Sequence, residues 1–535
     1  MGNETIGHSA IYQYIGSLSV ILGGAIFYIF LIETLTQSEV GSVTLLSTIL
    51  GLFSVILTIG IGPGIQHFVS YHMARNEYLA VSQILKRVTA LSILLGAFSS
   101  IAIYLLSPGI VFLFYRSDQM SYASTLALVR LLGLVSVFYV INGILSNCLL
   151  GLQKFRLTGI ILSLGSLIIY GLPIFLVLLY GNIDFIVLAW SFAYGVVSVV
   201  YISFIIRAVT GLKAGTGAPF DFSLLVRYSI PVFVSSLISY GAAYADRLLV
   251  AFLTNTATVA VYNLALLMST TVAFFIAPVN NISLPKLSEF LSISGKDAIL
   301  RGVNIASSVV SFLYFPVAMI VASLSPLIIA IIRPDYESAY PAVMIIMVST
   351  SVFVTQNVLT RAISSVRLTN VLVFASAFSF VSNAILSILL IPRLGIVGAS
   401  LGYASVFVTS FFVLYYFSRK SGIVAFDMGT LSKIALAGSL TFAMGIFLEL
   451  FVFPGVITAA DAGLIDKLHS LEILAVMSLV SLGTYIAVIR YTATFKLTDM
   501  DFIFSLLPRY LNRFKSLATR VLVRDRSVLA LVEQQ

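Results

Sequence analysis

The chain has 535 residues, of which 59% are hydrophobic and only 10% are charged. A soluble domain is typically about half apolar and about a quarter charged, so this composition and a mean hydropathy of +1.07 exclude that class. The formal net charge is +9, which we attribute to loops beside a membrane rather than to nucleic-acid binding. Cys148 is the single cysteine, so a disulfide framework is excluded.

Fourteen apolar runs have the length that crosses a bilayer as a helix, about 20 residues. A barrel strand needs only about ten residues with alternating polarity, so we predict an all-α integral membrane protein. The predicted spans are Ala10–Ile32, Val40–Gly62, Val88–Phe114, Ser121–Leu149, Leu157–Leu179, Phe185–Ile206, Ser229–Leu253, Val259–Ser283, Val303–Ile332, Tyr340–Leu359, Val371–Ile391, Ile396–Phe417, Leu431–Val452 and Leu471–Ile489.

The loops between these spans divide the cations unequally. The side that carries both termini holds 24 of the 30 Lys and Arg residues, and the other side holds only Arg116, Arg333, Arg393 and Lys467. Cytoplasmic loops carry an excess of cations. We therefore predict a multi-pass protein of the cell membrane with both termini in the cytoplasm.

A short internal repeat relates the first six spans to the next six. The motif Phe155–Thr158 opens the fifth span, and the similar Val366–Thr369 opens the eleventh. An even number of spans between repeats predicts two lobes of equal orientation, related by a pseudo-two-fold axis along the membrane normal. We predict a six-helix lobe at 1–207, a second at 208–420, two accessory spans at 421–490 and a basic cytoplasmic tail at 491–535.

Several catalytic signatures are missing from the sequence. It has no G-x-x-x-x-G-K-[ST] loop, no H-E-x-x-H motif and no Cys/His cluster, so we predict no cofactor, no metal site and no enzymatic activity. His67 and His72 are expected to be solvated loop residues. Asp499-Met500-Asp501 is interpreted as the start of an amphipathic helix that extends to Val521 and binds anionic lipid, rather than as a sugar-nucleotide site.

Charged residues inside predicted spans are functional candidates, because charge in hydrocarbon is costly. Arg130 lies about two turns into the fourth span, and Asp246 and Arg247 lie in the seventh. Two interpretations stay open for Arg130: an ion pair with Asp246, or a cation that faces a central cavity and binds phosphate or sugar. Glu449 is expected to reach the membrane surface.

The seventh span also places Ser236, Tyr240, Tyr244 and Arg247 at spacings of four, four and three residues, on one helical face. Hydroxyls and rings on such a face would suit a sugar path. Tyrosines at these spacings would equally suit packing, with their hydroxyls at the interface. Both interpretations remain open.

Four stretches of the sequence carry a family resemblance. They are Gly62–Ile65 leading to Ala74-Arg75, Gly151–Arg156, Tyr228–Pro231 with Ala245–Leu249 and Val261-Tyr262, and Leu390–Ala399. They resemble the polysaccharide, or O-antigen, flippases of the multidrug/oligosaccharidyl-lipid/polysaccharide exporter superfamily, over nearly the whole chain up to about Lys420. The first stretch resembles the family's first cytoplasmic loop, and the last, the most specific, resembles the loop between spans eleven and twelve.

This resemblance implies a two-lobed, alternating-access transporter. Its cargo would be an oligosaccharide on a polyprenyl or dolichyl (pyro)phosphate, moved from the cytoplasmic to the outer leaflet, and we expect a monomer. Arg130 and Arg247 are the candidate cations for the cargo phosphate. One alternative is a multidrug exporter of the same superfamily. Another is a membrane glycosyltransferase, for which Glu33 and Glu39 on the first outer loop are the only hint.

Overall fold

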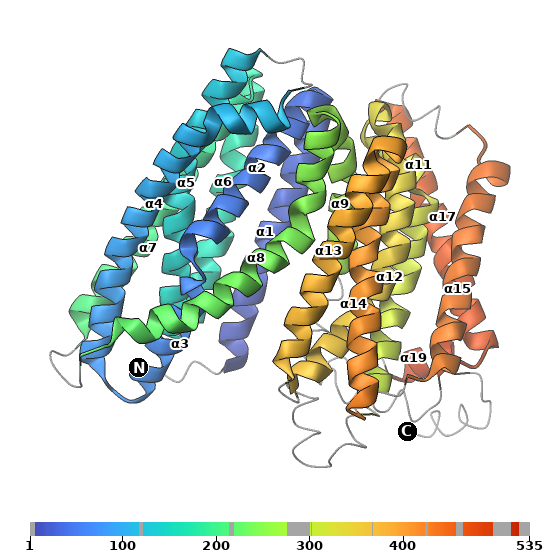
Figure 1. Ribbon diagram of the computed structural model, residues 1–535. Coiled ribbons are helices and arrows are strands. Elements are labelled where there is room, and N and C mark those ends of the chain that lie inside the picture. Colours follow the sequence, from blue (N-terminus) through green and yellow to red (C-terminus); the bar gives the residue numbers. More distant parts are fainter. Residues whose placement is uncertain are drawn as a thin grey trace. The chain divides into compact units, whose positions relative to one another are not determined.

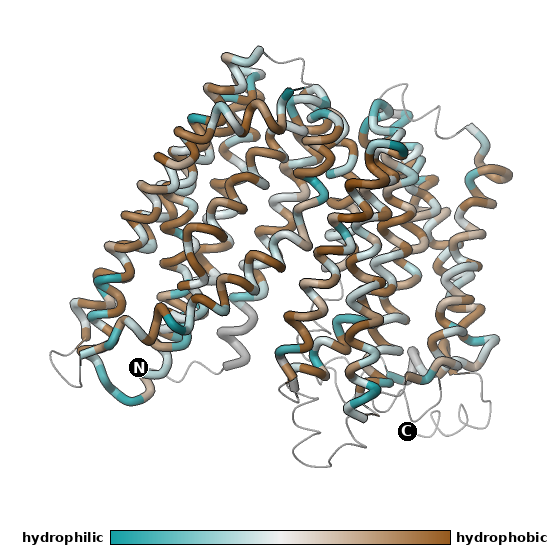
Figure 2. Tube along the Cα trace, in the orientation of Figure 1, coloured by the Kyte–Doolittle hydropathy of each residue, from teal (hydrophilic) through white to brown (hydrophobic). Residues whose placement is uncertain are grey.

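The computed structural model describes residues 6–116, 121–212, 219–274, 300, 302–365, 368–422, 426–455, 464–495 and 515–523. Every regular element within these ranges is a helix, and fourteen of the helices there are long and apolar enough to cross a membrane. Figure 1 shows the helices, and Figure 2 shows apolar residues along them with hydrophilic residues near many of their ends. The predicted all-α class and the fourteen spans are confirmed.

The chain forms two compact units, Met1–Asn263 and Leu264–Gln535. The predicted division into lobes at position 207 stays a prediction. The two compact units meet later in the chain than that position, because α8 (Phe222–Leu253) packs against α2 (Gln37–Thr58) and α3 (Ile61–Ala74) of the first unit.

The remaining helices of the first unit are α1 (Ile6–Thr34), α4 (Tyr78–Phe114), α5 (Tyr122–Gly151), α6 (Phe155–Tyr180), α7 (Asp184–Gly211) and the start of α9 (Thr256–Phe274), which continues into the second unit. They form a bundle in which α1 packs on α6, α4 on α5, and α7 on both α5 and α6. The buried core of the bundle comes mainly from α3, α4, α5 and α7, with Ile161 and Leu225 added by α6 and α8.

The sequence resemblance led us to expect a cytoplasmic loop in the segment Gly62–Arg75, and that expectation was wrong. The segment is a helix, α3. A break at Ile59 and Gly60 separates α3 from α2, because both residues have left-handed backbone angles, with φ of 47° and 65°. Gly60 is also required by space: a Cβ there would lie 2.5 Å from the backbone nitrogen of Phe233 on α8. The close approach of α8 therefore fixes where α2 ends and α3 begins.

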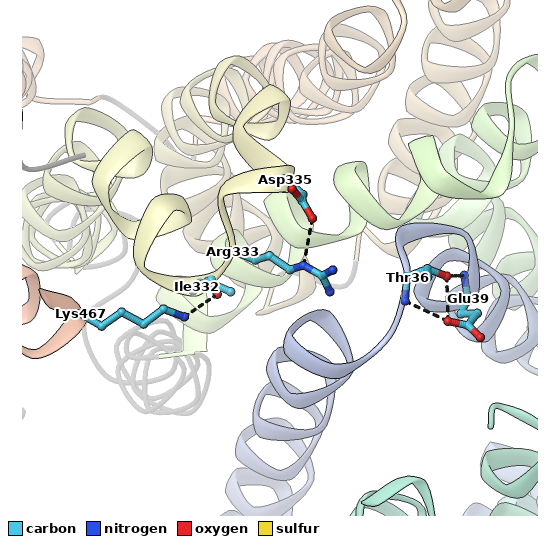
Figure 3. A network of polar contacts seen from close by, with 6 residues as sticks. All are labelled: Thr36, Glu39, Ile332, Arg333, Asp335 and Lys467. Carbon is cyan, nitrogen blue, oxygen red and sulfur yellow. Dashed lines mark hydrogen bonds and ion pairs between the residues drawn. The ribbon is translucent and has the colours of Figure 1, made fainter. Parts of the chain in front are cut away.

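A capping box caps the N-terminus of α2. The backbone nitrogen of Thr36 donates to Glu39 Oε2 at 2.9 Å, and Glu39 N donates to Thr36 Oγ1 at 3.4 Å (Figure 3). This arrangement satisfies free N–H groups at a helix start. Glu39, one of the two residues behind the glycosyltransferase alternative, thus has a structural role.

The second unit contains the helix Gly302–Ser323 and the helices that follow it in the chain. The predicted span Val303–Ile332 is two helices, because the chain breaks at Leu324 and Pro326 lies in the first turn of the next helix. The others are α11 (Ser325–Ile332), η1 (Pro334–Ala339), α12 (Tyr340–Ser365), α13 (Thr369–Leu394), α14 (Ile396–Lys420), α15 (Met428–Phe447), η2 (Leu448–Val452), α17 (Leu464–Tyr491) and α19 (Lys515–Leu522).

The two predicted accessory spans, α15 and α17, are packed into the second unit. The hydroxyl of Tyr485 on α17 donates to the Phe312 carbonyl at 3.0 Å. At the other end of α17, Lys467 Nζ donates to the Ile332 carbonyl at the end of α11 at 3.5 Å, next to an Arg333–Asp335 ion pair at 3.2 Å (Figure 3). Two apolar clusters add to these contacts, one that includes Tyr485 and one that includes Met477.

The predicted tail is described in part. Asp499-Met500-Asp501 and most of the predicted amphipathic helix lie outside the described residues. The short helix α19 is described, and Val523 just after it is buried against Tyr485 and Ile434. The end of the chain thus contributes to the apolar core of the second unit.

Candidate functional site

The polar face predicted on the seventh span is present on α8. Ser236, Tyr240, Tyr244 and Arg247 are all half-buried there. The rings of Tyr240 and Tyr244 stack with centroids 4.5 Å apart, and the Arg247 guanidinium carbon lies 4.8 Å from the Tyr244 ring centroid. These contacts join three of the four residues into one continuous surface.

Four tyrosines from other helices of the first unit join this surface. Tyr139 on α5 and Tyr194 on α7 have ring centroids 5.2 Å apart. Tyr139 also lies near Tyr244 and Tyr240. Each of the six rings is half-buried and so remains partly accessible. We call this set the tyrosine cluster: Tyr28, Tyr139, Tyr170, Tyr194, Tyr240 and Tyr244.

Helix α2 holds the cluster from one side. The hydroxyl of Tyr240 donates to the Thr48 carbonyl at 2.6 Å, and the hydroxyls of Tyr28 and Ser47 are hydrogen-bonded at 3.2 Å. A hydroxyl bound to a fixed carbonyl holds its ring in one orientation. The cluster therefore combines ordered ring faces with hydroxyl groups, which is a surface suited to a polar ligand that also has apolar faces.

Asp246 and Arg247 supply the charges of the site. Asp246 is fully buried, and its Oδ2 accepts a hydrogen bond from the Tyr262 hydroxyl on α9. Asp246 Oδ1 and Arg247 Nε are buried atoms with no hydrogen-bond partner among the described residues. The Arg247 guanidinium is attracted by the Asp246 carboxylate and lies near Tyr244 and Tyr28. An unpaired buried polar atom is costly, so a partner such as a water, an ion or a ligand would be bound favourably there.

Arg130 lies apart from this cluster. It is exposed on α5, and its guanidinium carbon is 4.7 Å from the ring centroid of Tyr104 on α4. The neighbouring Ile101 and Leu134 are also exposed, at 57% and 50%. Since Asp246 is bonded to Tyr262 instead, the structure does not bring Arg130 and Asp246 together. The cavity role of Arg130 stays a prediction.

The two histidines expected in a solvated loop lie on helix α3, which corrects that expectation. His72 Nδ1 and Glu77 Oε2 are 2.5 Å apart, so His72 ties the end of α3 to the start of α4. No group of three or more His, Cys, Asp or Glu residues in the described ranges could hold a metal ion. Glu449 lies in η2, half-buried near the end of its span.

A family model described as "Polysaccharide biosynthesis protein" matches residues 31–336. The chain belongs to this family. The match spans more than half of the sequence and includes α2 to α9, and with them the charged residues and five of the six tyrosines of the site. A comparison with curated protein sequences gives no match.

Solved structures with a similar fold include "Lipid II flippase MurJ, inward closed conformation", with 15% identity, a TM-score of 0.67, and coverage of 89% of this chain and 99% of that one. An inward-facing multidrug resistance MATE family transporter of the MOP superfamily is 16% identical, with a TM-score of 0.61 over 77% of this chain and 94% of that one. A MOP superfamily transporter from Pyrococcus furiosus is 14% identical, with a TM-score of 0.55 and the same coverage.

These findings confirm the resemblance stated from the sequence, and with the fourteen apolar helices they make the chain a multi-pass membrane protein. The fold is that of MurJ and of the MATE transporters. The sequence analysis named Ser236, Tyr240, Tyr244, Asp246 and Arg247 as candidates, and their binding role stays a prediction. It did not name the tyrosines of α1, α5, α6 and α7 or the bond from Tyr262 to Asp246. Each of these tyrosines lies in an apolar helix and reaches the others only through contacts between helices, which periodicity along one helix cannot reveal.

Proposed function

We propose that the chain is a flippase that moves a lipid-linked oligosaccharide from the cytoplasmic to the outer leaflet of the cell membrane by alternating access. Its family is concerned with polysaccharide biosynthesis, and MurJ, which shares the fold, is titled a lipid II flippase. The cargo would be an oligosaccharide on a polyprenyl or dolichyl (pyro)phosphate. Both termini would be cytoplasmic, in agreement with the distribution of cations.

The observation that carries this proposal is the position of Arg247 beside the tyrosine cluster. Its buried Nε has no hydrogen-bond partner among the described residues. Arginine binds phosphate through paired N–H groups, and an anionic cargo would complete the bonding. Tyrosine rings offer flat apolar faces and hydroxyls, which suit the C–H faces and hydroxyl groups of sugars. The site therefore matches both halves of a sugar phosphate.

Other parts of the proposal rest on the sequence. The protein would act as a monomer without a cofactor, and the basic tail would bind anionic lipid of the cytoplasmic leaflet. Arg130 would contribute a second cation to the transport path. Its exposed position on α5 makes the variant Arg130→Ala a separate test of that contribution.

The test is transport in vesicles that contain the purified chain and a labelled pyrophosphate-linked oligosaccharide, with neither ATP nor nucleotide sugar present. We expect the wild type to flip the lipid. Arg247→Ala should lower the rate by about ten- to a hundredfold, as loss of a charge-assisted hydrogen bond of about 1.5–3 kcal/mol implies. Arg247→Lys should keep part of the activity, because lysine still binds phosphate as a point charge. Arg207→Ala, at an exposed position on α7, is the matched control.

One result would contradict the proposed function, and another would contradict only the role of the site. A wild-type protein that is inserted and folded but flips no lipid-linked oligosaccharide would exclude this function. Export of cationic dyes by the same vesicles would then favour the multidrug alternative, and sugar transfer from a nucleotide donor would favour the glycosyltransferase. An Arg247→Ala variant with the wild-type flipping rate would leave the flippase function standing but remove the site from it.

A further inference from the structure

A second aromatic surface lies at the cation-rich end of the first unit, on α3 and the start of α8. The imidazole of His67 is parallel to the ring of Tyr228, with centroids 5.4 Å apart and planes at 2°. His67 also stacks with Tyr71, with ring centroids 6.4 Å apart, and the Arg75 guanidinium carbon lies 4.4 Å from the Tyr71 centroid. Four side chains thus form a continuous stack that ends in a cation.

The stack borders a pocket of about 510 Å³ along one face of α3. The pocket is lined by Pro63, Gln66, His67, Ser70 and Tyr71. These positions follow the three- and four-residue spacing of a helical face. The stack and the pocket therefore present rings, an amide and a hydroxyl to the same space.

The residues beneath the stack hold it in place. Phe68 packs edge-on against Tyr228 at 5.8 Å and against Phe220 at 5.3 Å, in contact with the buried core of the first unit. The Ser70 hydroxyl donates to the Gly151 carbonyl at the end of α5 at 2.9 Å. A ligand that binds here meets side chains already in position, which reduces the entropic cost of binding.

Two rings of the stack are exposed. Tyr71 is 43% exposed and Tyr228 is 40% exposed. Interfacial tyrosines that anchor a helix in the bilayer need no stacking partner and no pocket. Parallel ring faces beside amide and guanidinium groups are instead the features that a sugar ring and its phosphate require.

We propose that Gln66, His67, Tyr71, Tyr228 and Arg75, which we call the α3 platform, bind the sugar and phosphate next to the lipid carrier before the cargo reaches the tyrosine cluster. The sugar lies against Tyr71 and His67 with its hydroxyls near Gln66, and Arg75 binds the phosphate. This proposal rests on the flippase function, since it concerns the same cargo. It adds a separate loading site at the end of the first unit where cations are concentrated.

The test measures binding to the full-length chain in detergent by calorimetry. The probes are farnesyl diphosphate and its conjugates with glucose, galactose and N-acetylglucosamine. We expect at least one conjugate to bind more tightly than farnesyl diphosphate. Tyr71→Ala should lower the affinity for that conjugate about fivefold, and Tyr71→Phe should leave it within about twofold of the wild-type value. Neither variant should change the affinity for farnesyl diphosphate. Arg75→Ala should lower the affinity for every probe.

Tyr122→Ala, at a tyrosine that is 57% exposed at the start of α5, is the matched control and should leave all affinities unchanged. The proposal is overturned if no conjugate binds more tightly than farnesyl diphosphate. It is also overturned if Tyr71→Phe loses as much affinity as Tyr71→Ala, or if Tyr71→Ala has no effect at an unchanged melting temperature. If the wild type flips lipid in vesicles and any of these results is obtained, the α3 platform is rejected as a loading site and the flippase function is kept. Binding without flipping would reject the flippase function alone.

Discussion

The hydroxyl of Tyr262 on α9 donates a hydrogen bond to one carboxylate oxygen of Asp246 on α8, while the other oxygen has no hydrogen-bond partner within the described part of the chain. Both side chains are fully buried. The bond fixes the Asp246 carboxylate next to Arg247. The carboxylate attracts the Arg247 guanidinium electrostatically.

The first prediction concerns this bond. Tyr262→Phe removes the donor and leaves both oxygens of a buried carboxylate unpaired, which should cost about 1–3 kcal/mol of stability. We expect a clear fall in the melting temperature in detergent. Asp246→Asn in the same background should recover part of it, because a neutral amide is less costly to bury. Tyr180→Phe, at a ring that is 60% exposed, should change nothing. Equal melting temperatures for the two phenylalanine variants would contradict this role of Tyr262.

The second prediction concerns the space that Gly51 leaves for the tyrosine cluster. A Cβ at this position would lie 2.5 Å from the Tyr240 hydroxyl oxygen. Gly51→Ala should therefore break the bond from Tyr240 to the Thr48 carbonyl and lower the melting temperature and the flipping rate together. In a Tyr240→Phe background the hydroxyl is gone, so the same substitution should cost less.

Gly171→Ala is the control for the second prediction, because a Cβ there meets no atom within 4 Å. Alanine should be neutral or stabilising at that site, since it is the better helix former. If Gly51→Ala costs the same with and without the Tyr240 hydroxyl, the steric explanation is wrong.

The sequence predicts much of the fold because a bilayer constrains it strongly. Long apolar runs gave fourteen spans, and the spacing of Ser236, Tyr240 and Tyr244 gave the polar face of α8. Helix α3 could not be predicted in the same way, since it is short and its start depends on the approach of Phe233 to Gly60. The partner of Asp246 was also hidden, because contacts between helices leave no periodic signal in either one.

The third prediction concerns orientation. Asn182 lies in the connection between α6 and α7, and Asn76 lies in the turn between α3 and α4; both are exposed. Cysteines placed at these two positions should react with impermeant reagents from opposite sides of the membrane, with Asn76→Cys accessible from the cytoplasm. The background is Cys148→Ser, although native Cys148 is buried and should itself react slowly. Reaction of both cysteines from one side would contradict the predicted topology.

The last prediction concerns the end of the chain. Val523 is only 3% exposed and packs with Tyr485 and Ile434, while Arg490 Nη1 donates to the carbonyls of Arg520 at 2.5 Å and Val521 at 3.3 Å at the end of α19. The last carbonyls of a helix need such donors. Removing the segment from Lys515 onward should therefore lower the melting temperature of the second unit. Flipping by the folded fraction should remain measurable, because the tyrosine cluster lies in the first unit.

Point variants separate the contributions of the tail. Val523→Ala removes two buried methyl groups and should cost about 1.5 kcal/mol, at about 0.8 kcal/mol for each. Val480→Ala, at a position on α17 that is 43% exposed, should cost much less. Arg490→Ala should lower the melting temperature of the full-length chain but not that of the chain that ends before Lys515, where its acceptor carbonyls are gone. If Arg490→Ala is equally costly in both chains, Arg490 stabilises the protein by some contact other than its bonds to α19.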